Sequence, residues 1–355
     1  MQDLVVRNAR MRRRGLLAAG AATGLAGLAH TARAQPAARS ATLETVRKRG
    51  QLIAGVDTGI PGYAFQDSAG NWKGLDVSYC RAIAVAVLGD AQKVKYIGTT
   101  SQVRFSVLQS GEIDVLIRDS EHTLLRNSKL GFELPAVNFY TGQSFMVNKS
   151  LKVAHVKELN GATIGLLTGT TLETNIANYN GANNIKINTL LFDRPEEIYA
   201  AMQAGRCDGY TDDGGSVAAA RSAMKTPGDW VILPETISRQ PLGSFTRFGD
   251  DPWTSIVRWT HYAMLEAEVL GITKSNIDQV KATTKDPQTR QFLGLEGSLG
   301  KGLGVDDAFA YNIVKSEGNY GEVYETYFGS KGLGLARGLN NLYLNGGLQY
   351  PLSWY

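Results

Sequence analysis

The chain has 355 residues, of which 43% are hydrophobic and 20% are charged, a composition typical of a globular protein and not of a disordered or fibrous one. This length predicts two domains, because a single hydrophobic core stops growing near about 250 to 300 residues. The net charge of +4 comes from residues 1–34, which carry +5 and leave −1 for the rest of the chain. No basic field remains to attract nucleic acid or an anionic membrane, so we expect neither as a partner.

Residues 1–34 have the pattern of a secretory signal peptide. Three arginines, residues 12–14, precede an uncharged Gly/Ala/Leu stretch that ends near Leu28, and residues 32–34 (ARA) form a small-x-small cleavage site. The stretch is shorter than the roughly 20 residues of a membrane-spanning helix. We therefore expect cleavage after Ala34 and a mature protein in the periplasm. The arginines fit both a twin-arginine signal and the general secretion route.

Strands and helices are predicted to alternate after a linker at residues 35–40. Apolar runs and helical spacing predict strands at 52–56, 94–97, 113–117, 162–167, 189–192 and 209–211, and helices at 76–88, 195–204 and from a Ser101 cap to near Gly111. Such alternation predicts a largely parallel sheet. Cys80 and Cys207 lie far apart without Cys-x-x-Cys spacing, so we expect them to be buried and unpaired.

An internal echo predicts two similar lobes. Residues 108–114 (LQSGEID) and 202–208 (MQAGRCD) share an apolar-Gln-small-Gly-x-apolar-Asp pattern. In each copy a helix is expected to end at a glycine suited to the left-handed conformation, Gly111 or Gly205, with a strand directly after it.

Two extended stretches, 140–147 and 232–248, are predicted to cross between the lobes and form a hinge. This assigns residues 41–143 plus 240–355 to lobe 1 and residues 144–239 to lobe 2. Asp251 and Pro252 are predicted to begin a helix that ends near residue 270, with Asp251 as its cap. Possible helices at 306–314 and 321–328 are expected to pack on lobe 1.

Common catalytic and cofactor signatures are missing from the sequence. It contains no Gly-x-Ser-x-Gly, no phosphate-binding Gly-x-x-x-x-Gly-Lys-Ser/Thr and no His-Glu-x-x-His. His122, His155 and His261 do not have metal-ligand spacing. We therefore expect neither a cofactor nor a metal.

Charged residues instead follow the predicted strand at 113–117. The segment 118–126 (RDSEHTLLR) offers Arg126, whose planar guanidinium suits a carboxylate, and Asp119 or Glu121, which suit an ammonium. The alternative is a solvated loop with local ion pairs.

In lobe 2, polar residues follow two predicted strands. Gly169 opens a turn, and Thr170 or Thr171 caps the next helix, whose N-terminus could bind an anion; the alternative is a plain cap with Glu173 as its box partner. Of Asp212 and Asp213, one carboxylate could hold an ammonium while the other caps a helix, or both are solvated turn residues. Carboxylate-binding and ammonium-binding groups on opposite lobes would form a clamp for a zwitterion, which fits a free amino acid.

At these residues the chain resembles the periplasmic polar amino-acid binding proteins of ABC transporters, family 3, especially the general L-amino-acid branch. The resemblance covers nearly all of residues 42–355. It rests on these segments: 74–77 (GLDV), 108–114, 123–126 (TLLR), 169–173 (GTTLE), 205–208 (GRCD), 210–213 (YTDD), 337–340 (RGLN) and 346–350 (GGLQY).

The resemblance implies a type II periplasmic-binding-protein fold, an α/β Venus flytrap with two lobes and a hinge of two crossing strands. It implies that Arg126 binds the ligand's α-carboxylate, with help from the backbone at Thr123 and Thr171, and that Asp213 binds the α-ammonium. The candidate ligand-binding residues are completed by Thr170, Asp119, Glu121, His122 and Tyr63. The expected partners are a free L-amino acid and an inner-membrane ABC permease, which recognises the closed, monomeric form.

Two departures from the family pattern stand out. Ser120-Glu121-His122 replaces a Thr-Thr-Trp segment, so the wall that shapes side-chain specificity differs. Relatives also often carry cysteines at the positions of Ala54 and Gly165, which would be partners for Cys80 and Cys207.

Two other functions stay open at this point. Some relatives act as dehydratases on cyclic carboxylates such as arogenate, and Glu121-His122 could do general acid–base chemistry. A chemosensory amino-acid binding protein would have the same closed surface as a transport protein.

Overall fold

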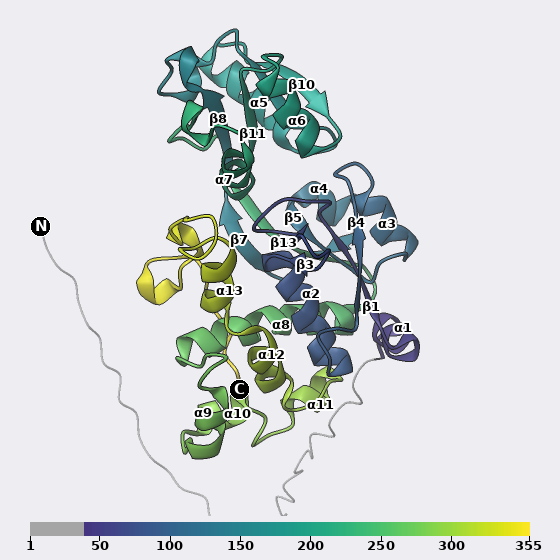
Figure 1. Cartoon of the computed structure of the whole chain (residues 1–355). Helices are drawn as coiled ribbons and strands as arrows, with labels where there is room; N and C mark the ends of the chain where they lie inside the picture. Colours follow the sequence, from purple (N-terminus) through teal and green to yellow (C-terminus); the bar gives the residue numbers. More distant parts are fainter. Residues whose placement is uncertain (1–38) are drawn as a thin grey trace, which may run out of the picture. The chain divides into compact units, whose positions relative to one another are not determined.

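The computed structural model describes residues 39–355 (Figure 1). The predicted signal peptide and most of the predicted linker lie outside this range. Ser40, the last residue of that linker, caps helix α1 (Ala41–Arg49), because its hydroxyl accepts a hydrogen bond from the backbone N–H of Leu43 at 3.0 Å. The sequence analysis missed this helix.

The first sheet has the strand order β4-β1-β5-β13-β6, and β7 also pairs with β13. Strands β4, β1 and β5 are parallel to one another, whereas β13 runs antiparallel to β5, β6 and β7. The strands are β1 (Leu52–Val56), β4 (Val94–Gly98), β5 (Val115–Glu121), β6 (Phe132–Glu133), β7 (Val137–Thr141) and β13 (Gln240–Arg247), and a separate small hairpin joins β2 (Phe65–Gln66) to β3 (Trp72–Lys73).

The second sheet has the order β10-β9-β11-β8-β12 and repeats this plan. Its three parallel strands are β10, β9 and β11, and β8 runs antiparallel to both β11 and β12. The strands are β8 (Gln143–Asn148), β9 (Thr163–Leu167), β10 (Asn188–Phe192), β11 (Gly209–Asp213) and β12 (Trp230–Ile232). The predicted parallel pairing is thus confirmed for three strands of each sheet, and the remaining strands are antiparallel.

The chain passes between the two sheets twice. It leaves the first sheet at the end of β7 and enters β8 two residues later, and it returns from β12 to β13. The two passages run side by side, because Thr141 pairs with Gln240 and the N–H of Ile237 donates to the carbonyl of Gln143 at 3.0 Å. The predicted two-lobed α/β fold with a hinge of two crossing strands is confirmed.

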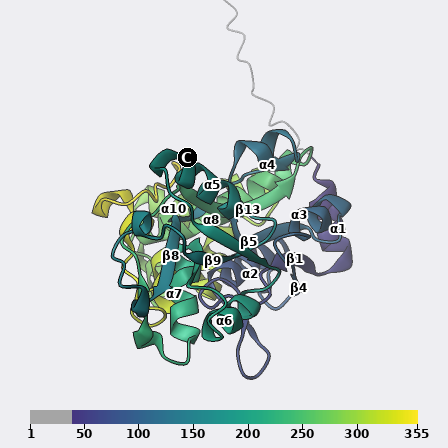
Figure 2. The ribbon, with the colours of Figure 1, turned by 90° about the horizontal axis from the view of Figure 1, so that it is seen from above.

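Helices pack on both sheets (Figures 1 and 2). The three helices of the second lobe are α5 (Leu172–Asn183), α6 (Pro195–Gln203) and α7 (Gly214–Ala223). The other helices, besides α1, are α2 (Leu75–Leu88), α3 (Arg104–Ser110), α4 (Leu124–Ser128), α8 (Asp251–Val269), α9 (Ile277–Thr283), α10 (Pro287–Phe292), α11 (Leu299–Leu303), α12 (Phe309–Glu317) and α13 (Tyr320–Tyr327). As predicted, the tail packs on the first lobe, where α12 contacts α2 and α8.

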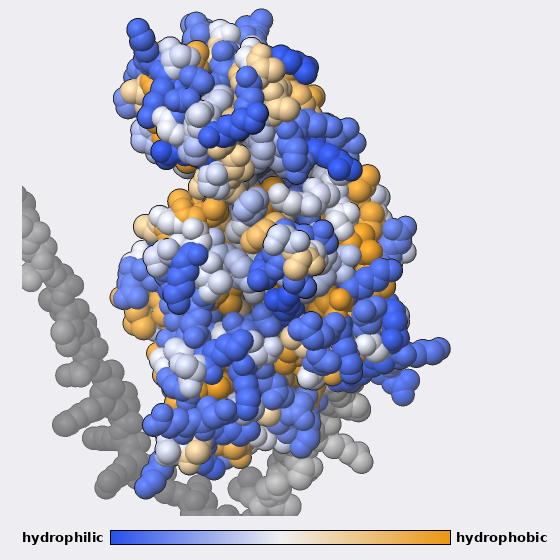
Figure 3. Space-filling view, viewed as in Figure 1, coloured by the Kyte–Doolittle hydropathy of each residue, from blue (hydrophilic) through white to orange (hydrophobic). Residues whose placement is uncertain are grey.

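Separate apolar cores stabilise the two lobes. Helix α2 is buried along nearly its whole length in a core that also contains α8, α12 and α13. In the second lobe, Phe145 and Val147 of β8 belong to one core and Met146 to another, as expected for a strand that buries both faces. No helix of residues 39–355 is long and apolar enough to cross a membrane. The face shown in Figure 3 is mostly hydrophilic.

The echoed segments have the same local structure. Gly111 and Gly205 both follow a helix with left-handed φ angles of 82° and 68°. The carboxylates of Asp114 and Asp208 then accept the backbone N–H of Ile53 and Thr163, respectively, each at 2.7 Å. Asp114 thereby ties its echo to β1 and Asp208 ties its echo to β9, which hold equivalent places in the two strand orders, so the prediction of two similar lobes is confirmed.

Several local predictions were wrong at their ends. Ser101 does not cap α3, which begins at Arg104 after Val103. The cap of α8 is Asp250 and not Asp251, because the Asp250 side chain accepts the N–H of Trp253 at 3.2 Å. Strands β5 and β11 continue past their predicted ends to Glu121 and Asp213, which places polar residues directly on the sheets.

Both cysteines are buried and unpaired, which confirms that prediction. A side chain at Gly165 would begin 3.4 Å from the sulfur of Cys207.

Candidate ligand-binding site

One small cavity is lined by residues of both lobes where strands β5 and β11 end. Its volume is about 30 Å³, close to the volume of one water molecule and far below the several hundred Å³ of an ordinary ligand pocket. From the first lobe the lining takes Ser101, Arg104, Arg118, Asp119, Glu121 and Arg126, and from β13, at the end of the second crossing, Gln240 and Leu242. From the second lobe it takes Leu167, Thr170, Thr171, Leu172, Asp212 and Asp213. Any amino acid that binds here must therefore move the lobes or these side chains.

Arg118 is fully engaged within the first lobe. Its guanidinium forms ion pairs with Asp57 and with Asp119, the latter at 3.1 Å, and its Nε donates to the carbonyl of Thr99 at 2.9 Å. These partners leave Arg118 little capacity for a ligand, and they make it a positioning residue for the cavity wall.

Arg126 and Arg104, by contrast, form no ion pair with an acid within residues 39–355. Arg126 donates to the backbone carbonyl of Glu121, and its guanidinium carbon lies 4.9 Å from the ring centre of Phe105. Arg104 lies at the same distance from that ring, is only 2% exposed, and its Nε and Nη1 have no hydrogen-bond partner. Burial lowers the pKa of both side chains, that of Arg126 to about 10. A buried cation without a counter-ion is unfavourable, so an anionic ligand group would stabilise this wall.

The sequence analysis missed Arg104. It lies at the start of α3, the helix that carries the first echo, and was taken as part of an amphipathic helix. The available signal was an arginine beside Phe105 on a helix whose other face is apolar. Only the tertiary structure shows that this arginine reaches the same cavity as Arg126, which lies 22 residues later.

The opposite wall carries two buried carboxylates of the second lobe. Asp213 caps α7, accepting the N–H groups of Gly215 at 2.8 Å and Ser216 at 3.2 Å, and it also accepts the hydroxyl of Tyr63 at 2.6 Å. Asp212 accepts the hydroxyl of Tyr210 at 2.6 Å. The residue pattern gave the cap and the ammonium to different aspartates, and the resemblance assigned the ammonium to Asp213. In the structure Asp213 is itself the cap of α7.

Buried carboxyl groups are concentrated at this wall. Burial, and next the charge of Asp213, raise the pKa of Asp212 well above its usual value, and burial likewise raises the pKa of Asp213. Burial also raises the pKa of Asp119 across the cavity to about 7. A cationic group placed among these carboxyls would lower the energy of their ionised forms. The site therefore combines unpaired guanidinium groups on one side with carboxyl groups that favour a cation on the other.

The turn before α5 completes the cavity. Gly169 has a φ of +71°, as the predicted turn requires, and the hydroxyl of Thr170 accepts the N–H of Leu172 at 3.3 Å. Thr171 is the first residue flanking the helix, but its hydroxyl donates to the carboxylate of Glu121 at 2.6 Å instead of capping. No capping box with Glu173 forms in this segment.

Three predicted site residues do not line the cavity. Thr123 caps α4 by accepting the N–H of Arg126 at 3.2 Å, and Tyr63 lies behind Asp213. The Nε2 of His122 lies 3.1 Å from the carbonyl of Ser244, and burial lowers the pKa of the ring to about 4, so the ring is neutral at pH 7. Glu121 and His122 thus have different partners and do not form the acid–base pair that a dehydratase would need.

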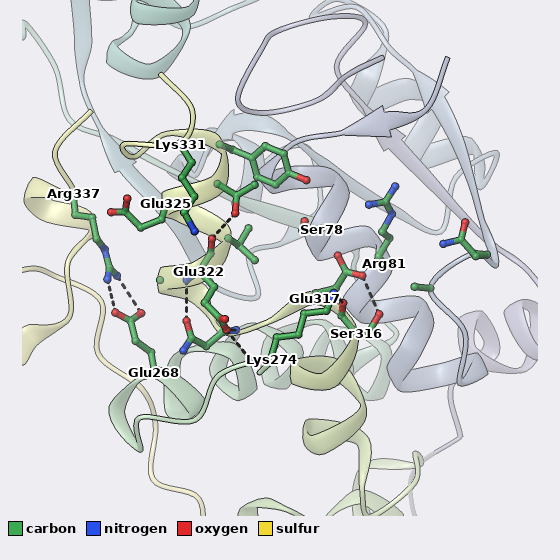
Figure 4. Close-up of a pocket in the computed structure, with 17 residues that line it drawn as sticks. Ser78, Arg81, Glu268, Lys274, Ser316, Glu317, Glu322, Glu325, Lys331 and Arg337 are labelled. Atoms are coloured by element: carbon green, nitrogen blue, oxygen red, sulfur yellow. Dashed lines mark hydrogen bonds and ion pairs between the residues drawn. The ribbon is translucent and has the colours of Figure 1, made fainter. Parts of the chain in front are cut away.

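A larger groove lies in the first lobe, between α2, α8 and the helices α12 and α13 (Figure 4). Its volume is about 800 Å³, but several of its charged groups already have partners inside the lobe. Arg337 forms a two-bond ion pair with Glu268, and the ammonium of Lys274 donates to the carbonyl of Ser316 at 2.5 Å (Figure 4). The groove lacks the unpaired buried groups of the smaller cavity, which is therefore the better candidate site.

Two lobes joined by two crossing strands, with a polar cavity between them, define the class of bacterial solute-binding proteins. Residues 52–293 match the model of the bacterial extracellular solute-binding proteins, family 3, and the chain belongs to this family.

Named relatives extend over most of the chain. It is 47% identical over 315 residues to the glutamate/glutamine/aspartate/asparagine-binding protein BztA of Rhodobacter capsulatus, with 88% of this chain and 93% of that protein covered. It is 46% identical over 317 residues to the general L-amino acid-binding periplasmic protein AapJ of Rhizobium johnstonii, with the same coverage. A solved periplasmic binding protein from Brucella ovis with glutathione bound superposes with a TM-score of 0.87 at 42% identity, covering 89% of this chain and all of that one.

Proposed function

We propose that this chain is the periplasmic substrate-binding component of an amino-acid ABC importer, which captures a free L-amino acid between its lobes and delivers it to an inner-membrane permease. The observation that carries the proposal is the division of charge around one cavity, with Arg104 and Arg126 unpaired on one wall and Asp213 on the other. This division matches the two charges of an amino acid. The names of BztA and AapJ support the same class of ligand.

Each clamp residue has a defined role in this proposal. Arg126 binds the α-carboxylate together with the N-terminus of α5 at Thr171, and Asp213 binds the α-ammonium. Asp119, Glu121 and Thr170 line the same space. The bounds 41–143 plus 240–355 and 144–239 describe the two parts that close on the ligand about the hinge.

Arg104 narrows the class of ligand. If Arg126 holds the α-carboxylate, the free Nε and Nη1 of Arg104 offer donors to a second acceptor on the ligand. Ser101 Oγ and Gln240 Oε1 are also buried, unpaired atoms of cavity-lining residues and would add polar contacts. We therefore expect the preferred ligands to carry a side-chain carboxylate or carboxamide, as glutamate and glutamine do.

Export and assembly follow from the same proposal. The leader at 1–34, by a twin-arginine or general secretion route, would deliver a monomer to the periplasm. The protein would act without turnover, because the Glu121-His122 pair is divided between separate partners.

The test uses the chain expressed with its own leader and purified from the periplasmic fraction, with its N-terminus determined by mass spectrometry. Calorimetry should show tighter binding of glutamate and glutamine than of alanine. Arg104→Gln should reduce this preference by about tenfold or more while alanine binding changes little, because the lost donors contact only the side chain. Arg206→Lys, at an exposed position, is the matched control. An absence of binding by any amino acid would refute the proposal. Equal losses of affinity for glutamate, glutamine and alanine in Arg104→Gln would mean that Arg104 binds the α-carboxylate.

A further inference from the structure

Glu121 forms a direct link between the lobes. It is the last residue of β5, and its Oε2 accepts the hydroxyl hydrogen of Thr171 at 2.6 Å, at the start of α5 in the second lobe. Its carboxylate has no ion-pair partner in residues 39–355, and Arg126 is the charged neighbour that attracts it. This carboxylate therefore lies where the clamp would hold the carboxylate of an amino acid.

A second link occupies the other half of the clamp. The hydroxyl of Tyr63, in the first lobe, donates to Asp213 in the second lobe at 2.6 Å, and both side chains are buried. The ring of Tyr63 is held by edge contacts with Phe139 and Phe328, at centre distances of 5.3 and 4.8 Å. A side chain at Gly215 would begin 2.6 Å from the Tyr63 hydroxyl, so the close approach of α7 depends on this glycine.

The two links imitate the two ends of an amino acid. Glu121 supplies a carboxylate to Thr171 beside Arg126, and Tyr63 supplies a hydrogen-bond donor to Asp213. With both in place the cavity holds only about 30 Å³. Side chains of the protein thus occupy the Thr171 hydroxyl and Asp213, while Arg126 keeps no ion-pair partner within residues 39–355.

We propose that Glu121 and Tyr63 are internal substitutes for the ligand, which hold the cleft closed without it, and that Glu121 is a residue that sets affinity by competing with the ligand's carboxylate. This inference rests on the proposed function for the identity of the ligand. Its structural half, the two hydrogen bonds that join the lobes, does not depend on that identity.

The two links make the protein bind an amino acid more weakly than the clamp residues would without them. A ligand can enter only the fraction of molecules in which both links are broken, and the apparent dissociation constant rises as that fraction falls. Glu121 supplies the competing carboxylate. Removing it should open the ligand-free protein and strengthen binding.

The experiment compares the wild type with Glu121→Ala, Tyr63→Phe, the double variant and Glu112→Ala. Glu112 is exposed, carries the same charge and has no side-chain hydrogen bond in the structure, which makes it the matched control. Small-angle X-ray scattering without ligand should give a larger radius of gyration for Glu121→Ala and the double variant, and an unchanged one for Glu112→Ala. Adding saturating glutamate should contract the double variant more than the wild type.

Calorimetry with glutamate should show a dissociation constant lower by about tenfold in Glu121→Ala, because a charge-assisted hydrogen bond no longer competes. Weaker binding in this variant would overturn the proposal and make Glu121 a direct ligand contact. An unchanged radius in the double variant would also overturn it. If the wild type binds no amino acid, the proposed function fails, and the scattering of the ligand-free variants still decides whether the links close the cleft.

Discussion

The two echoed segments share a backbone plan and differ in the charges that follow it. In each, a helix ends at a left-handed glycine, Gly111 or Gly205, and an aspartate then ties the turn to a parallel strand, β1 or β9. Around this plan the first lobe presents Arg104 and Arg126 together with Asp119 and Glu121, and the second presents the pair Asp212 and Asp213. Similar scaffolds thus give walls of different charge, which shows that the site depends on a few side chains and not on the plan of either lobe.

The largest effect should come from the first lobe's wall. Arg126→Lys keeps the charge but loses the planar fork that matches a carboxylate, so binding of glutamate should weaken about 100-fold, or roughly 2 to 3 kcal/mol. Calorimetry of the variant beside Arg206→Lys, the exposed position of the second echo, measures this effect. Unchanged affinity for glutamate in Arg126→Lys would mean that Arg126 does not contact the ligand, and the proposed difference in charge between the two walls would then not determine binding.

A second prediction concerns a buried acid behind the first wall. Asp76 of α2 is 2% exposed and accepts the N–H of Asp119 at 3.0 Å, and burial raises its pKa to about 8. The unfolded chain releases this proton near pH 4 and the folded chain near pH 8, so between these values the unfolded state binds fewer protons. The free energy of unfolding should therefore fall as the pH rises through this window.

Asp76→Asn removes the titration and keeps an oxygen that can accept the Asp119 N–H. The variant should gain stability over the wild type by about 1 to 3 kcal/mol between pH 5 and pH 8, measured by urea unfolding of the ligand-free protein. Asp229→Asn, on the exposed turn before β12, should show no such gain. A constant difference across this pH range would mean that Asp76 is ionised in the folded protein.

The sequence predicted the parts of this molecule that depend on local pattern. The echo, the strands around it and the glycine turns all follow from residues close together in the chain. The helices that were missed are short, such as α10 and α11, and their stability comes from tertiary packing, which leaves a weak periodic signal.

The candidate site could be predicted only in part, for a related reason. Asp213 ends β11 and Arg126 lies on α4 shortly after β5, in segments whose polar residues are conspicuous in the sequence. The contact of Glu121 with Thr171 joins residues 50 positions apart in different lobes, and the unpaired state of Arg104 depends on what surrounds it. The double role of Asp213, as cap of α7 and partner of Tyr63, likewise appears only when the lobes are together.

The smallest effect tests whether the two echoes are equivalent. A side chain at Gly111 or Gly205 would meet no atom within 4 Å, so alanine at either position costs only the strain of a left-handed backbone, about 1 kcal/mol. The two losses, measured by urea unfolding, should agree within about 0.5 kcal/mol.

Gly181→Ala, on the exposed side of α5, is the control with the opposite sign. It has the same open surroundings but no left-handed angle, so it should stabilise the protein by up to about 1 kcal/mol. If the losses of unfolding free energy in Gly111→Ala and Gly205→Ala differ by much more than this margin, the two turns contribute unequally to stability. The two echoes would then share sequence and geometry but contribute differently to the free energy of unfolding. The lobes would differ in stability at these turns as well as in the charges around the cavity.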